Sequence, residues 1–291
     1  MPTQTKEVTV SELLREGARF LEQRGLPFPQ REAELLLAAL LSCRRIDLYM
    51  EPAQPVSSEQ ERLFREQLAR RGGREPIQYI LGEVAFDRLI LSVRPGVFIP
   101  RPETELIVEA ARAIQPSPRH ILDLCTGSGA LAIALAKELP DAQVIATDID
   151  PTSLEVAQAN AQRNRCLSQI RFAQGDLFAP LRAEASHFDL IVCNPPYIPE
   201  RDRTTLPPEV RDYEPARALF APEEGTAFYR RILEEASSFL TPEGSLLFEM
   251  GAGQAGWLQG FAAESPFAVT FLKDLAGIDR VAICRRRSRH G

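Results

Sequence analysis

The chain has 291 residues, of which 44% are hydrophobic and 25% are charged, and this length suits one large α/β domain with a small companion. Its net charge is −6, whereas proteins that bind nucleic acids usually carry positive charge that displaces counterions from the phosphates. We therefore expect no direct nucleic-acid binding. The five cysteines are odd in number and lack C-x-x-C spacing, so we expect neither a disulfide framework nor a zinc ribbon. No apolar run approaches the roughly 20 residues of a membrane span, and the N-terminus has no signal-peptide pattern. We therefore expect a cytoplasmic protein.

Residues 1–73 are expected to form a small helical domain. Thr9 and Glu12 have capping-box spacing at the start of a first helix, which Gly25 can end. Pro29 is placed to open a second helix, and a third is expected from about Ser58 to the glycines at 72 and 73. The segment holds 11 basic and 11 acidic residues, so it carries no net charge.

Residues 74–100 are expected to form a β-hairpin that links two domains. The runs 77–81 and 89–93 are rich in residues that favour strands, and a short loop separates them. A segment of prolines and charged residues then leads into a helix that continues to Ala113.

Residues 101–288 are expected to form an α/β domain, because predicted strands and helices alternate from Arg119 onwards. This alternation implies a mostly parallel, doubly wound sheet of seven strands, in which the last two pair antiparallel across a short connection. The strands are expected at 120–124, 143–147, 170–173, 188–192, 245–249, 268–272 and 281–284, and the helices at 130–139, 152–164, 226–240 and 256–263. The basic residues 285–289 are expected to form a solvated, mobile end.

The first strand of this sheet runs into the loop Cys125-Thr126-Gly127-Ser128-Gly129, which opens a helix. The glycines let the backbone turn sharply beside a ligand, and the free N–H groups of the helix attract polar or anionic ligand atoms. The spacing also fits the dinucleotide fingerprint, so the loop alone does not separate a nicotinamide enzyme from a methyltransferase.

Two acidic residues after the next strands are expected to contact the same cofactor. Asp148 lies 21 residues beyond Gly127, where an acid commonly binds the ribose hydroxyls, and Asp150 before Pro151 is the better helix cap, which leaves Asp148 for the ligand. Asp176 follows the third strand, where a carboxylate can meet an adenine amino group.

The fourth strand runs directly into Asn194-Pro195-Pro196-Tyr197, at the sheet edge where α/β proteins bind ligands. The Asn194 side-chain oxygen and the Pro195 carbonyl can accept the two hydrogens of a planar amide or amino nitrogen, and the Tyr197 ring can stack on it. Methyl transfer from a sulfonium puts positive charge on that nitrogen, so these acceptors strengthen as the reaction proceeds. We expect no metal, because the sulfonium is already an activated donor.

With these motifs the sequence resembles the peptide chain release factor N5-glutamine methyltransferases, called the HemK or PrmC family. The resemblance covers nearly the whole chain. It rests on Glu-Pro-Ile-Gln-Tyr-Ile at 75–80 with Gly82, Ile-Pro-Arg-Pro-Glu-Thr-Glu at 99–105, residues 123–129, residues 194–197, and Phe-Glu-Met-Gly at 248–251 with Gln254.

The resemblance implies a helical substrate-recognition domain, a hairpin linker and a Rossmann-like class I methyltransferase domain. It implies S-adenosylmethionine as co-substrate, contacted by residues 125–129, Asp148, Leu177 and Asn194, and a target glutamine bound by residues 194–197. The implied substrate is the glutamine of the Gly-Gly-Gln motif in class I release factors. Two departures concern the cofactor, because Cys125 stands where many relatives have glycine and Leu177 where some have an aromatic ring.

Other functions fit parts of the pattern. The Asn-Pro-Pro-Tyr motif also occurs in adenine N6 methyltransferases of DNA, but the helical segment is neutral by count. A methyltransferase for a ribosomal-protein glutamine would share the fold and the motif. A cofactor-binding protein without catalysis is a more distant alternative, which intact Asn194 and Tyr197 disfavour. A nicotinamide dehydrogenase is a remote third alternative.

Overall fold

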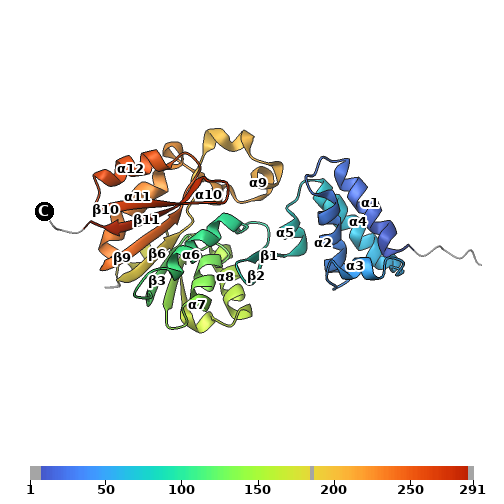
Figure 1. Ribbon diagram of the computed structural model, residues 1–291, viewed down its shortest axis with the longest axis horizontal. Coiled ribbons are helices and arrows are strands. Elements are labelled where there is room, and N and C mark those ends of the chain that lie inside the picture. The colour runs from blue at the N-terminus through green and yellow to red at the C-terminus, as the bar shows by residue number, and fades with distance from the viewer. Residues whose placement is uncertain (1–7, 184–186, 288–291) are drawn as a thin grey trace, which may run out of the picture. The chain divides into compact units, whose positions relative to one another are not determined.

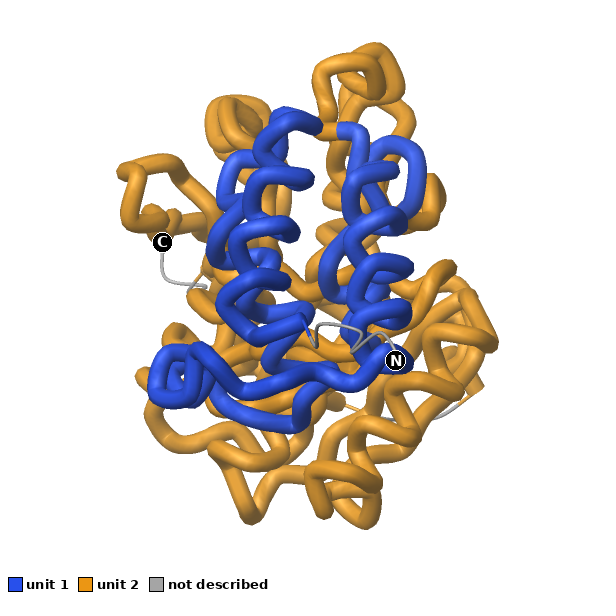
Figure 2. The backbone as a smooth tube through the Cα atoms, turned by 90° about the vertical axis from the view of Figure 1, so that its right-hand side faces the viewer, with its two compact units in different colours: residues 1–82, 208–213 blue, residues 83–207, 214–291 orange. Residues whose placement is uncertain are grey.

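The computed structural model describes residues 8–183 and 187–287. The chain divides into two compact units, one formed by residues 1–82 with 208–213 and the other by residues 83–207 with 214–291 (Figure 2). Within the described residues no helix is long and apolar enough to cross a membrane.

The smaller unit is helical. Its helices are α1 (Val10–Glu22), α2 (Pro29–Leu40), α3 (Asp47–Met50), α4 (Ser58–Gly72), α5 (Ile77–Leu81) and α9 (Pro208–Tyr213). The predicted capping box at Thr9 is present, and α4 begins with a second one between Ser57 and Gln60. The apolar faces of α1, α2 and α4 meet in a core that includes Leu13, Leu37 and Phe64.

A segment from late in the sequence completes this unit. The buried Arg71 of α4 forms ion pairs with Glu32 of α2, at 2.7 Å, and with Glu209 of α9, at 3.1 Å. The Tyr213 hydroxyl donates to the Gly73 carbonyl at 2.6 Å. Because Arg71 is buried, its charge depends on both carboxylates, so α9 is an integral part of the helical unit.

The prediction of a strand at 77–81 was wrong. These residues form α5, which begins after Pro76 and ends where Gly82 adopts a left-handed φ of 77°. The hairpin follows, with β1 (Glu83–Phe86) antiparallel to β2 (Leu89–Ser92). The apolar run at 77–81 suited either structure, and the flanking proline and glycine favour a short helix.

The larger unit contains the predicted seven-stranded sheet, which confirms the expected fold class (Figure 1). The strand order is β10-β11-β9-β6-β3-β4-β5, and β11 alone runs in the direction opposite to the other six strands. The strands are β3 (His120–Leu124), β4 (Gln143–Asp148), β5 (Ile170–Gln174), β6 (Phe188–Cys193), β9 (Leu240–Glu249), β10 (Phe267–Lys273) and β11 (Asp279–Arg286).

Helices cover both faces of the sheet. α6 (Glu105–Arg112), α7 (Ala130–Glu138) and α8 (Pro151–Arg163) pack on one face with Ile121 and Val192. α11 (Ala227–Phe239) and α12 (Ala255–Ala263) pack on the other with Leu122 and Ile191. Successive residues of a strand thus enter opposite cores, which explains why these strands are apolar runs rather than alternating ones.

The connections contain short elements that the sequence analysis did not predict. They are the strands β7 (Ile198–Pro199) and β8 (Phe220–Ala221), helix α10 (Ala216–Leu219), and the 3₁₀ turns at Pro102–Thr104, Leu167–Gln169, Ala179–Leu181, Glu200–Thr205 and Glu223–Gly225. β7 and β8 pair in parallel directly after residues 194–197.

The expected mobile end at 285–289 was partly wrong. Arg285 and Arg286 belong to β11, and Arg287 donates to the carbonyls of Phe267 and Ala262 at 3.0 and 3.2 Å. Residues 288 and 289 lie outside the described residues.

Candidate active site

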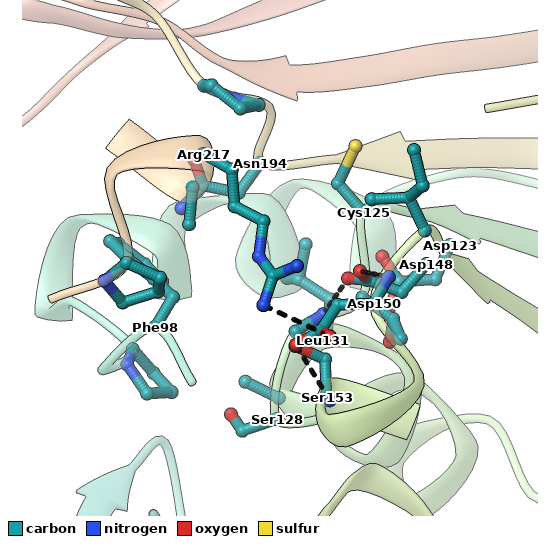
Figure 3. A pocket seen from close by; sticks show the side chains of 18 of the residues that line it. Phe98, Asp123, Cys125, Ser128, Leu131, Asp148, Asp150, Ser153, Asn194 and Arg217 are labelled. Carbon is teal, nitrogen blue, oxygen red and sulfur yellow. Dashed lines mark hydrogen bonds and ion pairs between the residues drawn. The ribbon is translucent and has the colours of Figure 1, made fainter. Parts of the chain in front are cut away.

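A cavity of about 300 Å³ opens in the larger unit beyond the carboxyl ends of the central strands (Figure 3). Of the predicted site residues, those that line it are Cys125, Thr126, Gly127, Ser128, Asp148, Asp176, Leu177, Asn194 and Pro196. Gly129, Pro195 and Tyr197 do not line it. The glycine loop, both predicted acids and the Asn-Pro-Pro-Tyr segment therefore meet around one space, as the sheet topology requires.

The glycine loop adopts left-handed backbone at three positions, with φ of 56° at Cys125, 56° at Gly127 and 85° at Gly129. Cys125 therefore adopts a conformation that glycine would adopt at less cost. Gly129 caps α7 and serves packing, since a β-carbon there would lie 3.1 Å from the β-carbon of Ala157. Its absence from the cavity wall follows from that role.

Asp123, to which the sequence analysis gave no role, is the deepest carboxylate of the cavity. It is fully buried, and its Oδ2 accepts from Thr126 Oγ1 at 2.5 Å and from the Ala132 amide at 3.1 Å. Its Oδ1 and the Ser128 hydroxyl have no partner among the described residues. Burial raises the pKa of Asp123 to about 7. Buried polar atoms without partners favour a polar ligand here, and a carboxylate favours a cationic one.

Asp148 faces the cavity, as expected, but it also accepts two local hydrogen bonds, which was not expected. Its Oδ2 accepts from the Gly127 amide at 2.8 Å and its Oδ1 from the Asp150 amide at 2.9 Å. Each oxygen keeps a second lone pair for a ligand hydroxyl. Asp150 caps α8 as expected, accepting from the amides of Thr152 and Ser153.

The far wall comes from the loop after β5. Leu177 is buried with a left-handed φ of 48°, and its carbonyl accepts from the Thr147 hydroxyl at 3.3 Å. Asp176 forms an ion pair with Arg231 of α11 at 2.5 Å. Leu177 offers an apolar surface, and Asp176 still has acceptor capacity for an amino group beside it.

The segment around α10 closes another side of the cavity. Arg217 reaches Asp150 with an ion pair of 3.1 Å, drawn as a dashed line in Figure 3. Pro215 and Ala218 line the cavity beside it, and Phe98 and Phe228 add aromatic surface. This wall was not predicted, because the segment that forms it has neither regular periodicity nor a motif.

The polar contacts of Asn194 fix its side chain at the end of β6. Its Nδ2 donates to Thr104 Oγ1 at 3.0 Å and to Glu249 Oε2 at 3.1 Å. No donor among the described residues reaches its Oδ1. With both Nδ2 hydrogens used, the amide oxygen remains the group that Asn194 can offer to a ligand.

Tyr197 has a different environment from the one its ring was predicted to have. Its hydroxyl donates to Glu249 Oε1 at 2.9 Å, and its ring packs against the core on the α11 face. Burial and the neighbouring carboxylate raise the pKa of this phenol above its usual range. Tyr197 thereby anchors the loop from the side of the core and not from the cavity.

Gln254, for which no role was predicted, holds the same loop. Its Nε2 donates to the Tyr197 carbonyl at 3.0 Å, and its Oε1 accepts from the Tyr229 hydroxyl and the Gly251 amide, each at 2.8 Å. The Asn-Pro-Pro-Tyr segment is therefore held at both ends by side-chain hydrogen bonds, from Asn194 to the buried Glu249 and from the partly buried Gln254 to the Tyr197 carbonyl. The described residues contain no cluster of His, Cys, Asp or Glu arranged to hold a metal ion.

Two family models match the chain. The model described as the PrmC N-terminal domain matches residues 12–82, and the methyltransferase small domain matches residues 90–206. Together they cover most of the helical unit and much of the unit that holds the cavity.

Curated relatives match over nearly the whole chain. A release factor glutamine methyltransferase of Geobacter sulfurreducens is 42% identical over 274 residues, which are 94% of this chain and 95% of the relative. The proteins of the same name from Thermodesulfovibrio yellowstonii and Nitratidesulfovibrio vulgaris are 38% and 36% identical, over 89% and 98% of this chain and 93% and 98% of their own lengths.

Solved structures share the fold at lower identity. A ribosomal protein L11 methylase from Lactobacillus delbrueckii aligns with a TM-score of 0.51 and 21% identity, covering 70% of this chain and 99% of its own. The human Mettl16 catalytic domain aligns with a TM-score of 0.56 and 13% identity, covering 81% and 84%. These likenesses support the methyltransferase fold and say nothing about the substrate.

Proposed function

The chain belongs to the family of release factor glutamine methyltransferases, and on that premise we propose that it methylates the side-chain amide nitrogen, N5, of the glutamine in the Gly-Gly-Gln motif of class I peptide chain release factors. The methyl donor is S-adenosylmethionine. The observation that carries the proposal is the orientation of Asn194, whose amide oxygen is left as an acceptor beside the cavity.

The cavity offers suitable partners for each part of S-adenosylmethionine. The unpartnered Asp123 Oδ1 and Ser128 Oγ suit the ammonium and carboxylate of the methionine end. Asp148 suits the ribose hydroxyls, while Leu177 and Asp176 suit the face and the amino edge of the adenine. When bound, S-adenosylmethionine supplies an activated methyl group on its sulfonium.

Asn194 and Pro195 act on the target nitrogen. The Asn194 amide oxygen and the Pro195 carbonyl accept the two hydrogens of the glutamine amide and hold its nitrogen in line with the donor. Positive charge develops on that nitrogen during transfer, so both acceptors bind the transition state more tightly than the ground state. Pro196 fixes the direction in which the loop leaves the site.

A glutamine beside two glycines is a suitable target for a narrow site, because no bulky neighbour blocks its entry. The helical unit, in this proposal, binds a second surface of the release factor and so supplies binding energy that orients the reacting end. Residues 1–73 hold equal numbers of acidic and basic residues, which argues against DNA as the substrate.

Mass spectrometry of an intact class I release factor, incubated with the full chain and deuteromethyl-labelled S-adenosylmethionine, tests the proposal. We expect one labelled methyl group on the Gly-Gly-Gln glutamine and none on a release factor in which that glutamine is replaced by alanine. An unmodified release factor, together with labelled glutamine in a ribosomal protein offered under the same conditions, would favour the ribosomal alternative.

A further inference from the structure

Four polar side chains from three parts of the chain form one buried network beside the cavity. Glu249, the last residue of β9, is 1% exposed and accepts from the hydroxyls of Thr104 and Tyr197 and from Asn194 Nδ2. Thr104 precedes α6 and is itself 3% exposed. Asn194 is the member of this network whose remaining polar atom is available to a substrate.

The hydrogen positions in this network are determined by Glu249. An ionised carboxylate only accepts, so the Thr104 hydroxyl must turn its hydrogen towards Glu249 and its lone pairs towards Asn194. Asn194 then faces two acceptors, at 3.0 and 3.1 Å, and meets both with its amide nitrogen. The opposite amide orientation would bring Oδ1 against a carboxylate oxygen, so it is excluded electrostatically.

Charge adds to this orientation. Among the described residues Glu249 forms no ion pair, and its partners are three neutral donors. Burial raises the pKa of Glu249 above its usual value, and the hydrogen bonds from Thr104 and Tyr197 oppose this rise because they stabilise the ionised form. A carboxylate that donates no hydrogen and accepts from the Asn194 nitrogen polarises that amide, which makes its oxygen a stronger acceptor.

We propose that Glu249, with Thr104 as its intermediary, is a positioning residue for methyl transfer: it fixes the Asn194 amide with its oxygen towards the target nitrogen and strengthens that oxygen as an acceptor. The inference rests on the proposed function, since it concerns the nitrogen that Asn194 binds. Glu249 acts through Asn194 and does not line the cavity itself.

Single variants of the full chain give the first test, with kcat and KM measured on a release factor. Glu249→Leu removes all three acceptor contacts, and we expect kcat to fall on the order of a hundredfold, as for loss of a direct polar partner. Glu249→Gln keeps the shape without the charge, and Thr104→Val removes the intermediary. We expect both to lower kcat by roughly tenfold. S-adenosylmethionine affinity should stay within about twofold in both Glu249 variants, because Glu249 does not line the cavity.

The Asp87 carboxylate gives a control within the larger unit. It accepts from Arg112 Nη2 at both oxygens, at 3.1 and 2.9 Å, and it does not line the cavity. Asp87→Leu should lower the unfolding temperature and leave kcat unchanged. A comparable loss of kcat in Asp87→Leu would mean that the Glu249 effect reports general destabilisation.

A double-mutant cycle with Asn194→Ala separates a positioning role from an independent one. If Glu249 acts through Asn194, Glu249→Leu should change kcat by less than about twofold once Asn194 is alanine. Equal losses in both backgrounds would overturn the inference. If Glu249→Leu does not fold, the same cycle with Glu249→Gln or Thr104→Val decides the question.

The wild-type enzyme distinguishes the two ways of failing. If it does not methylate the release factor glutamine, the proposed function is wrong. If it does, and the cycles are additive, the proposed function stands and the role of Glu249 is wrong.

Discussion

Gly225 lies so close to Tyr197 that a β-carbon on residue 225 would come 2.1 Å from the Tyr197 carbonyl oxygen. Gly225 also has a left-handed φ of 86°. The turn before α11 thus packs directly against the backbone of the Asn-Pro-Pro-Tyr loop, and residue 225 has room for a hydrogen atom only.

Gly225→Ala should therefore displace the loop and lower both activity and stability. Gly253→Ala is the matched control, because Gly253 has a φ of 83° but no atom within 4 Å of the added β-carbon. The backbone cost of about 1–2 kcal/mol is common to both variants. We expect Gly253→Ala to lose only this stability, whereas Gly225→Ala should also lose at least about tenfold in kcat, because it displaces the residues that hold the reacting group. Equal kcat in the two variants would contradict the contact.

Asn194→Ala should lower turnover by roughly a hundredfold or more and leave S-adenosylmethionine affinity nearly unchanged, because it removes an acceptor from the target nitrogen. Asn194→Asp offers a sharper comparison. It keeps an oxygen in the same place but sets a second carboxylate beside Glu249, whose Oε2 is 3.1 Å from the Asn194 nitrogen. We expect it to be as inactive as the alanine variant at neutral pH. Steady-state kinetics and calorimetry measure both quantities, and wild-type turnover in either variant would refute the assigned role.

Cofactor affinity should depend on pH through Asp123. Burial raises its pKa to about 7, so it is neutral below that value when the cavity is empty, and a neutral side chain binds an ammonium poorly. We expect the dissociation constant of S-adenosylmethionine to rise by up to roughly tenfold per pH unit below 7. Asp123→Asn should bind S-adenosylmethionine weakly, with a dissociation constant that does not depend on Asp123 titration. Because S-adenosylmethionine itself titrates equally in both experiments, the comparison of wild type and variant removes that contribution.

The same shift affects stability with a defined sign. A raised pKa means that the folded, ligand-free protein holds the Asp123 proton more tightly than the unfolded chain does. The contribution of Asp123 to stability is then fully present below about pH 4 and is lost as the pH rises through about 7. Thermal unfolding of the wild type against Asp123→Asn across this range should show the loss in the wild type alone.

Asp148→Ala should weaken S-adenosylmethionine binding by about tenfold to a hundredfold, the equivalent of one charge-assisted hydrogen bond. The variant also removes an acceptor from the amides of Gly127 and Asp150, so its unfolding temperature should fall. Asp148→Asn keeps an acceptor oxygen and should retain more of the stability than of the affinity. Calorimetry that found unchanged affinity in the alanine variant would rule out a ribose contact.

The fold was predictable wherever one physical pattern dominated a segment. Apolar strand runs, the capping box at Thr9, and Asp150 before Pro151 gave correct elements because they are local signals. The run at 77–81 failed because its apolar residues suit a short helix as well as a strand, and Gly82 decided the outcome.

The site was predictable where the end of a strand carried a recognisable motif, and less so where it depends on contacts between residues far apart in the sequence. Asn194 and Asp148 were found by their place after a strand. Glu249 ends β9 at the same edge of the sheet, so the same rule could have selected it. That Thr104 meets both Asn194 and Glu249, 90 and 145 residues away, depends on tertiary structure and leaves no periodicity in the sequence.

Helix α9 is synthesised long after the other helices of the unit to which it belongs. The helical unit begins at the start of the chain, but Glu209, the second partner of Arg71, is made only after residues 83–207. At typical rates of about 5–20 residues per second, the ribosome takes on the order of ten seconds to make that stretch. During this interval the buried Arg71 guanidinium has Glu32 but lacks its second carboxylate partner. Its final folding step therefore waits for residues 208–213, so the helical unit is completed only after β3, β4, β5 and β6 of the larger unit have been made.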